Sequence, residues 1–147
     1  MDITLVRATA EDVGEYVRIG RLAISRFNTV TIDAAGALRE IEESVVYMIQ
    51  TVTRVIGFIS YIRPSPEHAY IAEVQVEPDF RGCGAGGYAL DVVLKELHEV
   101  ALIDLHTHPE NPAQRLYRRH GFQETGEIIQ NYHDTGEPRM RMVLKRP

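Results

Sequence analysis

The segment Val74-Gln75-Val76-Glu77-Pro78-Asp79-Phe80-Arg81-Gly82-Cys83-Gly84-Ala85-Gly86-Gly87 decides the fold of this chain. A β-branched run leads into a glycine-rich turn, after which apolar residues recur at helical spacing up to Val100. Glycine lacks a Cβ atom, so the backbone of such a turn can bend tightly and approach a ligand closely. The first amides of the helix have no intrahelical acceptor, and the helix dipole adds partial positive charge there. The segment therefore predicts a strand, an anion site suited to a diphosphate with Arg81 beside it, and a helix.

The sequence on both sides of this loop alternates between short strands and helices. Thr9 and Asp12 form a weak capping box before a helix whose buried stripe is expected at Val13, Tyr16, Val17, Gly20, Ile24 and Phe27. Asn111 and Pro112 are expected to begin the last helix, and Gly121 to end it. A further helix is predicted at 34–43 and strands at 6–8, 45–49, 55–61 (ended by Pro64), 70–76, 101–107, 122–129 and 139–144. This pattern predicts an α/β (α+β) fold with a mixed sheet, antiparallel in its first half and with a β-α-β crossover around the glycine loop.

Length and composition narrow the function classes. The chain has 147 residues, 44% of them hydrophobic and 25% charged, which predicts a single domain over residues 1–147. Its one cysteine, Cys83, indicates a reducing compartment, so we expect a cytoplasmic protein. No apolar run reaches the roughly 20 residues of a membrane helix. The net charge of −5 argues against broad affinity for nucleic acid and is compatible with a cationic substrate, without selecting one.

Three interpretations of the glycine loop need no family comparison. Gly82, Gly84 and Gly87 satisfy the dinucleotide pattern G-x-G-x-x-G, but that pattern should follow its strand directly, and here residues 78–81 intervene. The P-loop pattern fails because no Gly-Lys-Ser/Thr follows. A glycine turn without a ligand accounts for one or two of the glycines, and not for the whole cluster beside an arginine.

The segment Arg81-Gly82-Cys83-Gly84-Ala85-Gly86 resembles the Arg/Gln-x-x-Gly-x-Gly/Ala signature of the GCN5-related N-acetyltransferases (GNAT). Further along, Asn111-Pro112-Ala113-Gln114-Arg115-Leu116-Tyr117-Arg118-Arg119-His120-Gly121-Phe122 resembles the second signature of that family, Asn…Ala-x-x-Leu-Tyr-x-x-x-Gly-Phe. The resemblance implies acetyl-CoA as co-substrate. It also implies a mostly antiparallel central sheet of six to seven strands, flanked by about four helices, whose fourth and fifth strands splay apart to admit the pantetheine.

The resemblance also implies which residues bind the cofactor and which residue acts as the general acid. It implies that Arg81, Gly82, Cys83, Gly84, Ala85 and Gly86 hold the diphosphate, that Val74, Gln75 and Val76 pair with the pantetheine, and that Asn111 contributes to the same site. In the family, the tyrosine at the position of Tyr117 faces the sulfur of CoA and acts as general acid. From the helix pattern alone, Tyr117 reads equally as a core tyrosine bonded to a backbone carbonyl.

Two residues compete for the role of general base. Glu73 stands just before the Val74–Val76 run, and a carboxylate there can take a proton directly or through water. His106 replaces a glutamate that peptide-acetylating members of the family often carry near this place, and a histidine serves equally well as base. The sequence is equally compatible with Glu73 and His106 as structural residues that have no catalytic role. His106, His108 and Asp104 share a strand face in a pattern compatible with zinc, but no further ligand pattern accompanies them, so no metal is expected.

The turn-rich segment 131–138 is expected to border the acceptor groove, as the equivalent hairpin often does in the family. Tyr132, His133 and Glu137 are its candidate substrate contacts. We therefore expect direct transfer of an acetyl group to a primary amine (a small molecule, a polyamine, or a peptide or protein amine) in a ternary complex. A homodimer would fit the size of the enzyme. The alternative of another class is a non-catalytic acyl-CoA-binding sensor.

Overall fold

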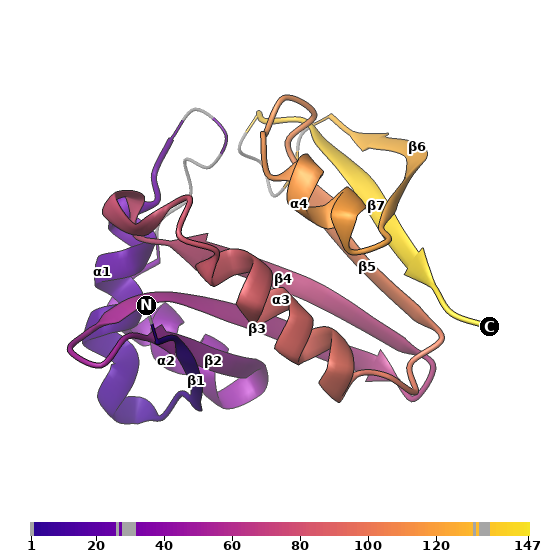
Figure 1. The fold of residues 1–147 in the computed structure, drawn as a ribbon. Coiled ribbons are helices and arrows are strands. Elements are labelled where there is room, and N and C mark those ends of the chain that lie inside the picture. The colour runs from indigo at the N-terminus through magenta and orange to yellow at the C-terminus, as the bar shows by residue number, and fades with distance from the viewer. Residues whose placement is uncertain (1, 26, 28–31, 131, 133–135) are drawn as a thin grey trace.

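A computed structural model describes residues 2–25, 27, 32–130, 132 and 136–147 (Figure 1). Its strands are β1 (Thr4–Arg7), β2 (Val45–Gln50), β3 (Val55–Ser65), β4 (His68–Val76), β5 (Leu102–Thr107), β6 (Gln123–Ile129) and β7 (Arg139–Lys145). Its α-helices are α1 (Val13–Leu22), α2 (Ala34–Glu43), α3 (Ala85–Glu96) and α4 (Gln114–Arg119). Two 3₁₀ turns, η1 (Ala10–Asp12) and η2 (Pro78–Phe80), precede α1 and the glycine loop.

The described strands form one mixed sheet in the order β1-β2-β3-β4-β5-β7-β6. Every neighbouring pair is antiparallel except β4 and β5, which are parallel and joined through α3. One apolar core joins α1 and α2 to one face of the sheet through Tyr16, Ile19, Ile41 and Phe58. A larger core joins α3 and α4 to the other face, and Figure 1 shows these two helices in front of the strands. The sheet predicted from the sequence is confirmed.

The strands β4 and β5 separate at a bulge. Ser60 of β3 pairs with Glu73 of β4, but the next residue, Tyr61, pairs with Ile71, so Ala72 is an extra residue in β4. Pairing of β4 with β5 covers only His68–Ile71 and stops at this bulge. Beyond it, β5 remains paired with β7, while β4 remains paired with β3. The predicted splay between the fourth and fifth strands is therefore confirmed, and the bulge explains where it starts.

The first helix differs from the sequence prediction. The Thr9 capping box is present, but it caps η1, and α1 follows only from Val13. Because α1 ends at Leu22, Ile24 lies beyond the helix and is 47% exposed, so the predicted stripe is wrong there. Ile19, which the stripe omitted, is fully buried.

Two other boundaries also differ. Strand β3 continues past Pro64 to Ser65, because Pro64 falls in an irregular stretch of the pairing with β4, where no ladder N–H is needed. The last helix begins at Gln114 and not at Pro112. The Asn111 side chain still caps the turn before it, since Asn111 Oδ1 accepts a hydrogen bond from Ala113 N at 2.9 Å. None of the helices in the described part of the chain has the length and apolarity needed to cross a membrane.

Candidate active site

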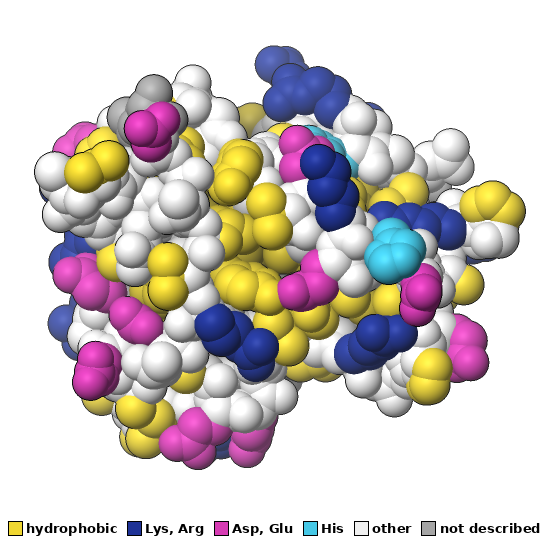
Figure 2. Space-filling view, turned by 60° about the horizontal axis from the view of Figure 1, so that its bottom comes forward, with side chains coloured by type: hydrophobic (Ala, Val, Ile, Leu, Met, Phe, Trp, Pro, Cys, Tyr) yellow, Lys and Arg dark blue, Asp and Glu magenta, His cyan; other side chains and the backbone are white. Residues whose placement is uncertain are grey.

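A cavity of about 980 Å³ opens where β4 and β5 diverge. Its walls come from both faces of the sheet: α1 and α2 on one side, and the glycine loop, the start of α3 and α4 on the other. In the space-filling view, hydrophobic side chains gather along the middle of one face, with charged side chains on both sides (Figure 2). The cavity brings together most of the predicted site residues, namely Glu73, Val74, Gln75, Val76, Arg81, Gly82, Gly84, Ala85, Gly86, His106, Asn111, Tyr117 and Tyr132.

Among the described residues, two of the predicted site residues, Cys83 and Glu137, do not line this cavity. Cys83 is exposed and lines a shallow depression on the outer side of the loop, next to Tyr88 and residues 2–4. Glu137 forms an ion pair with Arg139 at 2.6 Å, and it is Arg139 that lines the cavity. His133 lies outside the described residues.

The glycine loop has the backbone conformation that the sequence predicted. Gly82 and Gly84 have φ values of +82° and +87°, a region that other residues rarely adopt. A Cβ atom at either position would meet open space, so the glycines serve the conformation and leave the approach to the loop clear. Gly84 is the N-cap of α3, and the first i→i−4 bond of the helix runs from Tyr88 N to Gly84 O at 3.0 Å. The amides of residues 85–87 precede that bond and have no intrahelical acceptor, which is the arrangement that binds anions at helix N-termini.

The start of the glycine loop is fixed by the buried carboxylate of Glu77, which the sequence analysis did not identify. Glu77 is only 7% exposed and accepts two hydrogen bonds from Arg54 Nη2, at 2.7 and 2.8 Å. Arg18 of α1 lies 3.4 Å from the same carboxylate. The Glu77 N–H donates to Ile56 O at 2.7 Å, which continues the β3–β4 ladder up to the loop. These contacts fix the point at which the chain leaves β4.

Tyr117 lies on the buried face of α4 and lines the cavity. It is 9% exposed, and its ring packs edge-on against Phe122 at 6.2 Å between centroids. Among the described residues, its hydroxyl has no hydrogen-bond partner, which excludes the bond to a backbone carbonyl that a structural tyrosine would make. Burial, and after it the charge of Glu73, raise the pKa of Tyr117 to about 12. The phenol is therefore protonated at neutral pH and able to donate.

Glu73 follows the bulge in β4 and is half-buried in the cavity wall. Its Oε2 accepts a hydrogen bond from Gln75 Nε2 at 2.9 Å. Burial raises the pKa of Glu73, the Gln75 bond opposes that rise, and the charge of Glu40 adds to it. Arg139 lowers the pKa by a smaller amount. The net direction is upward, which makes Glu73 a stronger base than an exposed glutamate.

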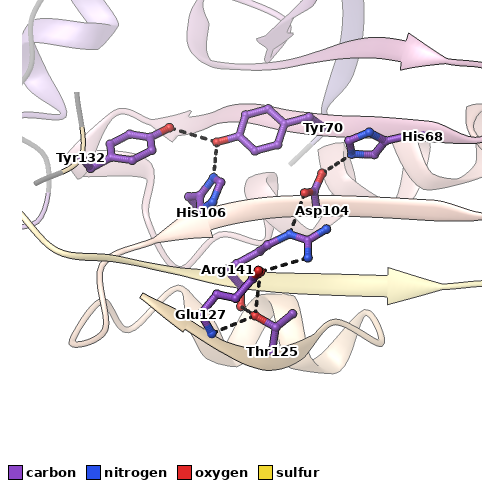
Figure 3. Close-up of polar contacts among 8 residues, drawn as sticks. All are labelled: His68, Tyr70, Asp104, His106, Thr125, Glu127, Tyr132 and Arg141. Carbon is purple, nitrogen blue, oxygen red and sulfur yellow. Dashed lines mark hydrogen bonds and ion pairs between the residues drawn. The ribbon is translucent and has the colours of Figure 1, made fainter. Parts of the chain in front are cut away.

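His106 belongs to a second polar cluster at the splay (Figure 3). The Tyr70 hydroxyl lies 2.8 Å from His106 Nδ1 and 3.0 Å from the Tyr132 hydroxyl. These three rings come from β4, β5 and the segment before β7, and all of them line the cavity. Burial raises the pKa of Tyr70, so its hydroxyl stays protonated. Tyr70, absent from the sequence prediction, thus orients the candidate base His106.

Two residues of the possible zinc pattern, Asp104 and His108, make other contacts in the structure. Asp104 is bound by His68 at 2.6 Å and by Arg141 at 2.9 Å, and Arg141 also bonds Glu127, as Figure 3 shows. His108 Nδ1 accepts a hydrogen bond from Glu110 N at 3.0 Å. Within the described residues no three His, Cys, Asp or Glu side chains are grouped as metal ligands.

A family model described as "Acetyltransferase (GNAT) family" matches residues 15–122, well over half of the chain. The chain belongs to the GNAT family. It is accordingly an acyltransferase of the class that takes acetyl groups from acetyl-CoA.

Solved structures agree with this assignment at the level of the fold. Ard1 from Thermoplasma volcanium is 23% identical with a TM-score of 0.86, over 100% of this chain and 99% of that one. The ribosomal-protein-S18-alanine N-acetyltransferase from Escherichia coli is 21% identical with a TM-score of 0.81, over 98% and 94%. The PaiA N-acetyltransferase from Thermoplasma acidophilum, solved with coenzyme A, is 15% identical with a TM-score of 0.81, over 99% and 100%. No curated protein matches the chain.

Within this GNAT fold, two further cavity residues that sequence reasoning missed come from the helices on the other face of the sheet. Tyr16 of α1 and Glu40 of α2 line the same cavity as Glu73. Tyr16 was predicted only as part of a core stripe, and Glu40 lies in a helix with several other acidic residues. No local signal singles out Glu40, because its role depends on where α2 packs against the sheet.

Proposed function

We propose that this GNAT enzyme transfers the acetyl group of acetyl-CoA to a primary amine while both substrates are bound in one ternary complex. One observation carries the proposal: a single cavity is lined by the glycine loop, by Glu73 with its raised pKa, and by a Tyr117 hydroxyl without a partner among the described residues. A diphosphate site, a base and an acid are the three elements that acyl transfer from a thioester to an amine requires.

The residues at the loop fit the cofactor. Arg81 and the amides at the start of α3 would hold the diphosphate, and Asn111 lines the same cavity. Beyond the bulge, the β4 edge at Val74, Gln75 and Val76 has left β5, so its backbone groups are available to pair with the amides of the pantetheine as an added strand would. Bound acetyl-CoA supplies an activated acetyl group as a thioester.

The chemistry assigned to this chain is a pair of proton transfers. Glu73, directly or through water, takes a proton from the ammonium of the acceptor, because only the neutral amine has a lone pair for attack on the carbonyl. As the N–C bond forms and the C–S bond breaks, Tyr117 gives its proton to the departing thiolate. The new N–C bond leaves one excess proton on the nitrogen, which is lost as the C–S bond breaks and returns to Tyr117 through solvent. The proton on Glu73 passes to solvent, so one proton is released per turnover and both groups are restored.

His106 is the alternative base. The Tyr70 hydroxyl fixes the orientation of its ring, and Tyr132 extends the same chain of hydrogen bonds toward the acceptor side of the cavity. We further propose that Tyr132 contacts the acceptor. Glu137 contributes indirectly, by neutralising the cavity-lining Arg139.

The test is CoA release in a panel of amine acceptors, with the Tyr117→Phe variant beside the wild type. Turnover is expected to fall on the order of a hundredfold in the variant, while calorimetry gives the same affinity for acetyl-CoA. Tyr47→Phe is the matched control, because Tyr47 bonds Glu96 and does not line the cavity. An acyl-CoA sensor would bind acetyl-CoA and release no CoA with any amine, and that result would overturn the proposal.

A further inference from the structure

The charges around the cavity are unevenly distributed. Arg81 of the glycine loop and Arg119 of α4 line it without an ion pair among the described residues, as expected for contacts to phosphates. The third lining arginine, Arg139, is ion-paired with Glu137 and donates to Phe27 O at 2.9 Å. Its charge is therefore compensated. On the α1–α2 side, the cavity presents carboxylates.

Glu40 is the carboxylate that catalysis by Glu73 and Tyr117 does not use. It projects from α2 into the cavity and is half-buried. Within the described residues its side chain has only a long contact with Ser44 Oγ, at 3.5 Å, and no ion pair. A half-buried carboxylate that no cation of the described residues compensates is available to bind a cation from outside.

Glu40, Glu73 and Tyr117 line the same cavity, from α2, β4 and α4. After the effect of burial, the charge of Glu73 contributes to the raised pKa of Tyr117. Burial raises the pKa of Glu73, to which Glu40 adds, and the pKa of Tyr16 is raised by burial and then by both carboxylates. Glu73 is therefore coupled electrostatically both to Tyr117 and to Glu40.

Two stacked aromatic rings line the same cavity as the two carboxylates. Tyr16 stacks on Phe58 with 4.0 Å between ring centroids, and the two residues are 3% and 2% exposed. The methylene chain of an aliphatic amine can lie against these rings.

We infer that the acceptor is a small aliphatic diamine, whose reacting amine lies at Glu73 and whose second ammonium lies at Glu40. This inference rests on the proposed function. The reacting amine must lose its proton and so stops compensating Glu40, whereas the second ammonium keeps its charge throughout the reaction. Glu40 is thus a specificity-determining residue that binds the end of the acceptor that does not react.

The experiment compares three acceptors that share a four-carbon chain: diaminobutane, aminobutanol and butylamine. The wild-type kcat/KM is expected to be highest for diaminobutane, by about tenfold to a hundredfold, the range for a hydrogen bond to a charged group. Glu40→Gln should remove that preference, because kcat/KM falls most for diaminobutane and least for butylamine, which has no second ammonium. Glu42→Gln, an exposed change on the same helix, is the matched control and should behave as wild type. Acetyl-CoA affinity, measured by calorimetry, verifies that each variant is folded.

Three results would overturn the inference. Equal kcat/KM for the three acceptors would show that no second ammonium is bound. A higher kcat/KM for a short peptide than for diaminobutane would show that the acceptor is a peptide and not a diamine. A uniform loss over all acceptors in Glu40→Gln would mean that Glu40 only adjusts the pKa of Glu73. In each case amine acetylation itself persists, so these failures are distinct from a failure of the proposed function, in which no amine accepts an acetyl group.

Discussion

The carboxylate of Glu73 and the hydroxyl of Tyr117 face one cavity from β4 and α4, and they are electrostatically coupled. Burial, and after it the negative charge of Glu73, hold the pKa of Tyr117 at about 12. When Glu73 takes a proton from the acceptor amine, that negative charge disappears and the pKa of Tyr117 falls. The proposed acid therefore becomes stronger at the stage when the thiolate leaves.

The pH dependence of kcat is expected to identify the base. Because burial raises the pKa of Glu73 above its ordinary value, the wild-type kcat should fall on the acid side at a higher pH than an exposed glutamate would give. Glu73→Gln should abolish this limb and lower kcat by about 10²-fold to 10⁴-fold. If the acid limb survives in Glu73→Gln and disappears in His106→Gln, the base is His106 and its partner Tyr70 acquires the positioning role.

The glycine loop should tolerate no side chain at Gly84. At φ +87° an alanine costs about 1–2 kcal/mol of stability, and its methyl group would occupy the open space in front of the loop. Gly126→Ala is the control, since Gly126 has a φ of +86° and lies in β6 away from the cavity. Both variants should unfold at a lower temperature than the wild type. In calorimetry, only Gly84→Ala should bind acetyl-CoA more weakly. Equal affinity in the two variants would contradict the diphosphate assignment.

The position of the β4 edge depends on Gly57 in β3. A Cβ atom there would lie 2.3 Å from Gln75 O and 3.2 Å from Val76 Cα, so both neighbours are backbone atoms that cannot move aside cheaply. We expect Gly57→Ala to lower the free energy of unfolding by about 1–3 kcal/mol and to weaken acetyl-CoA binding. Gly14→Ala in α1, where the added methyl group meets nothing, should leave both quantities unchanged or raise stability slightly.

The cluster of Asp104 with His68 and Arg141 is expected to stabilise the fold and to take no part in catalysis. Asp104 is 5% exposed and joins β4 to β7 through His68 and Arg141. Asp104→Asn removes the charge that Arg141 faces, and because Arg141 and His68 are partly exposed we expect a loss of about 1–3 kcal/mol in denaturant unfolding. Glu99→Gln, at an exposed ion pair with His98, should cost nothing measurable. At temperatures where the Asp104→Asn variant is folded, its kcat should match that of the wild type. A large decrease in kcat would instead show that Asp104 takes part in catalysis.

Local signals in the sequence gave accurate expectations for several elements. Asp33 caps α2, whose observed bounds, Ala34–Glu43, are those predicted. The glycine loop and the start of α3 also agree, because a positive φ at Gly84 and the free amides that follow depend only on nearby residues. Ile19 and Ile24 were misjudged, since the face that a helix buries depends on where the helix ends and on the surface that it meets.

The sequence by itself determined that this chain carries the two GNAT signatures. It also determined a strand, a glycine loop and a helix with free N-terminal amides, and a tyrosine on the inner face of the last helix, because these features follow from short-range backbone preferences and helical spacing. Only the tertiary structure decided that β4 bulges at Ala72 to open the splay, that Tyr70 bonds His106, and that Glu40 and Glu73 line the same cavity. The physical reason is range. Dihedral preferences and caps act over a few residues, whereas burial, strand register and the coupling of charges depend on which distant segments the folded sheet brings together.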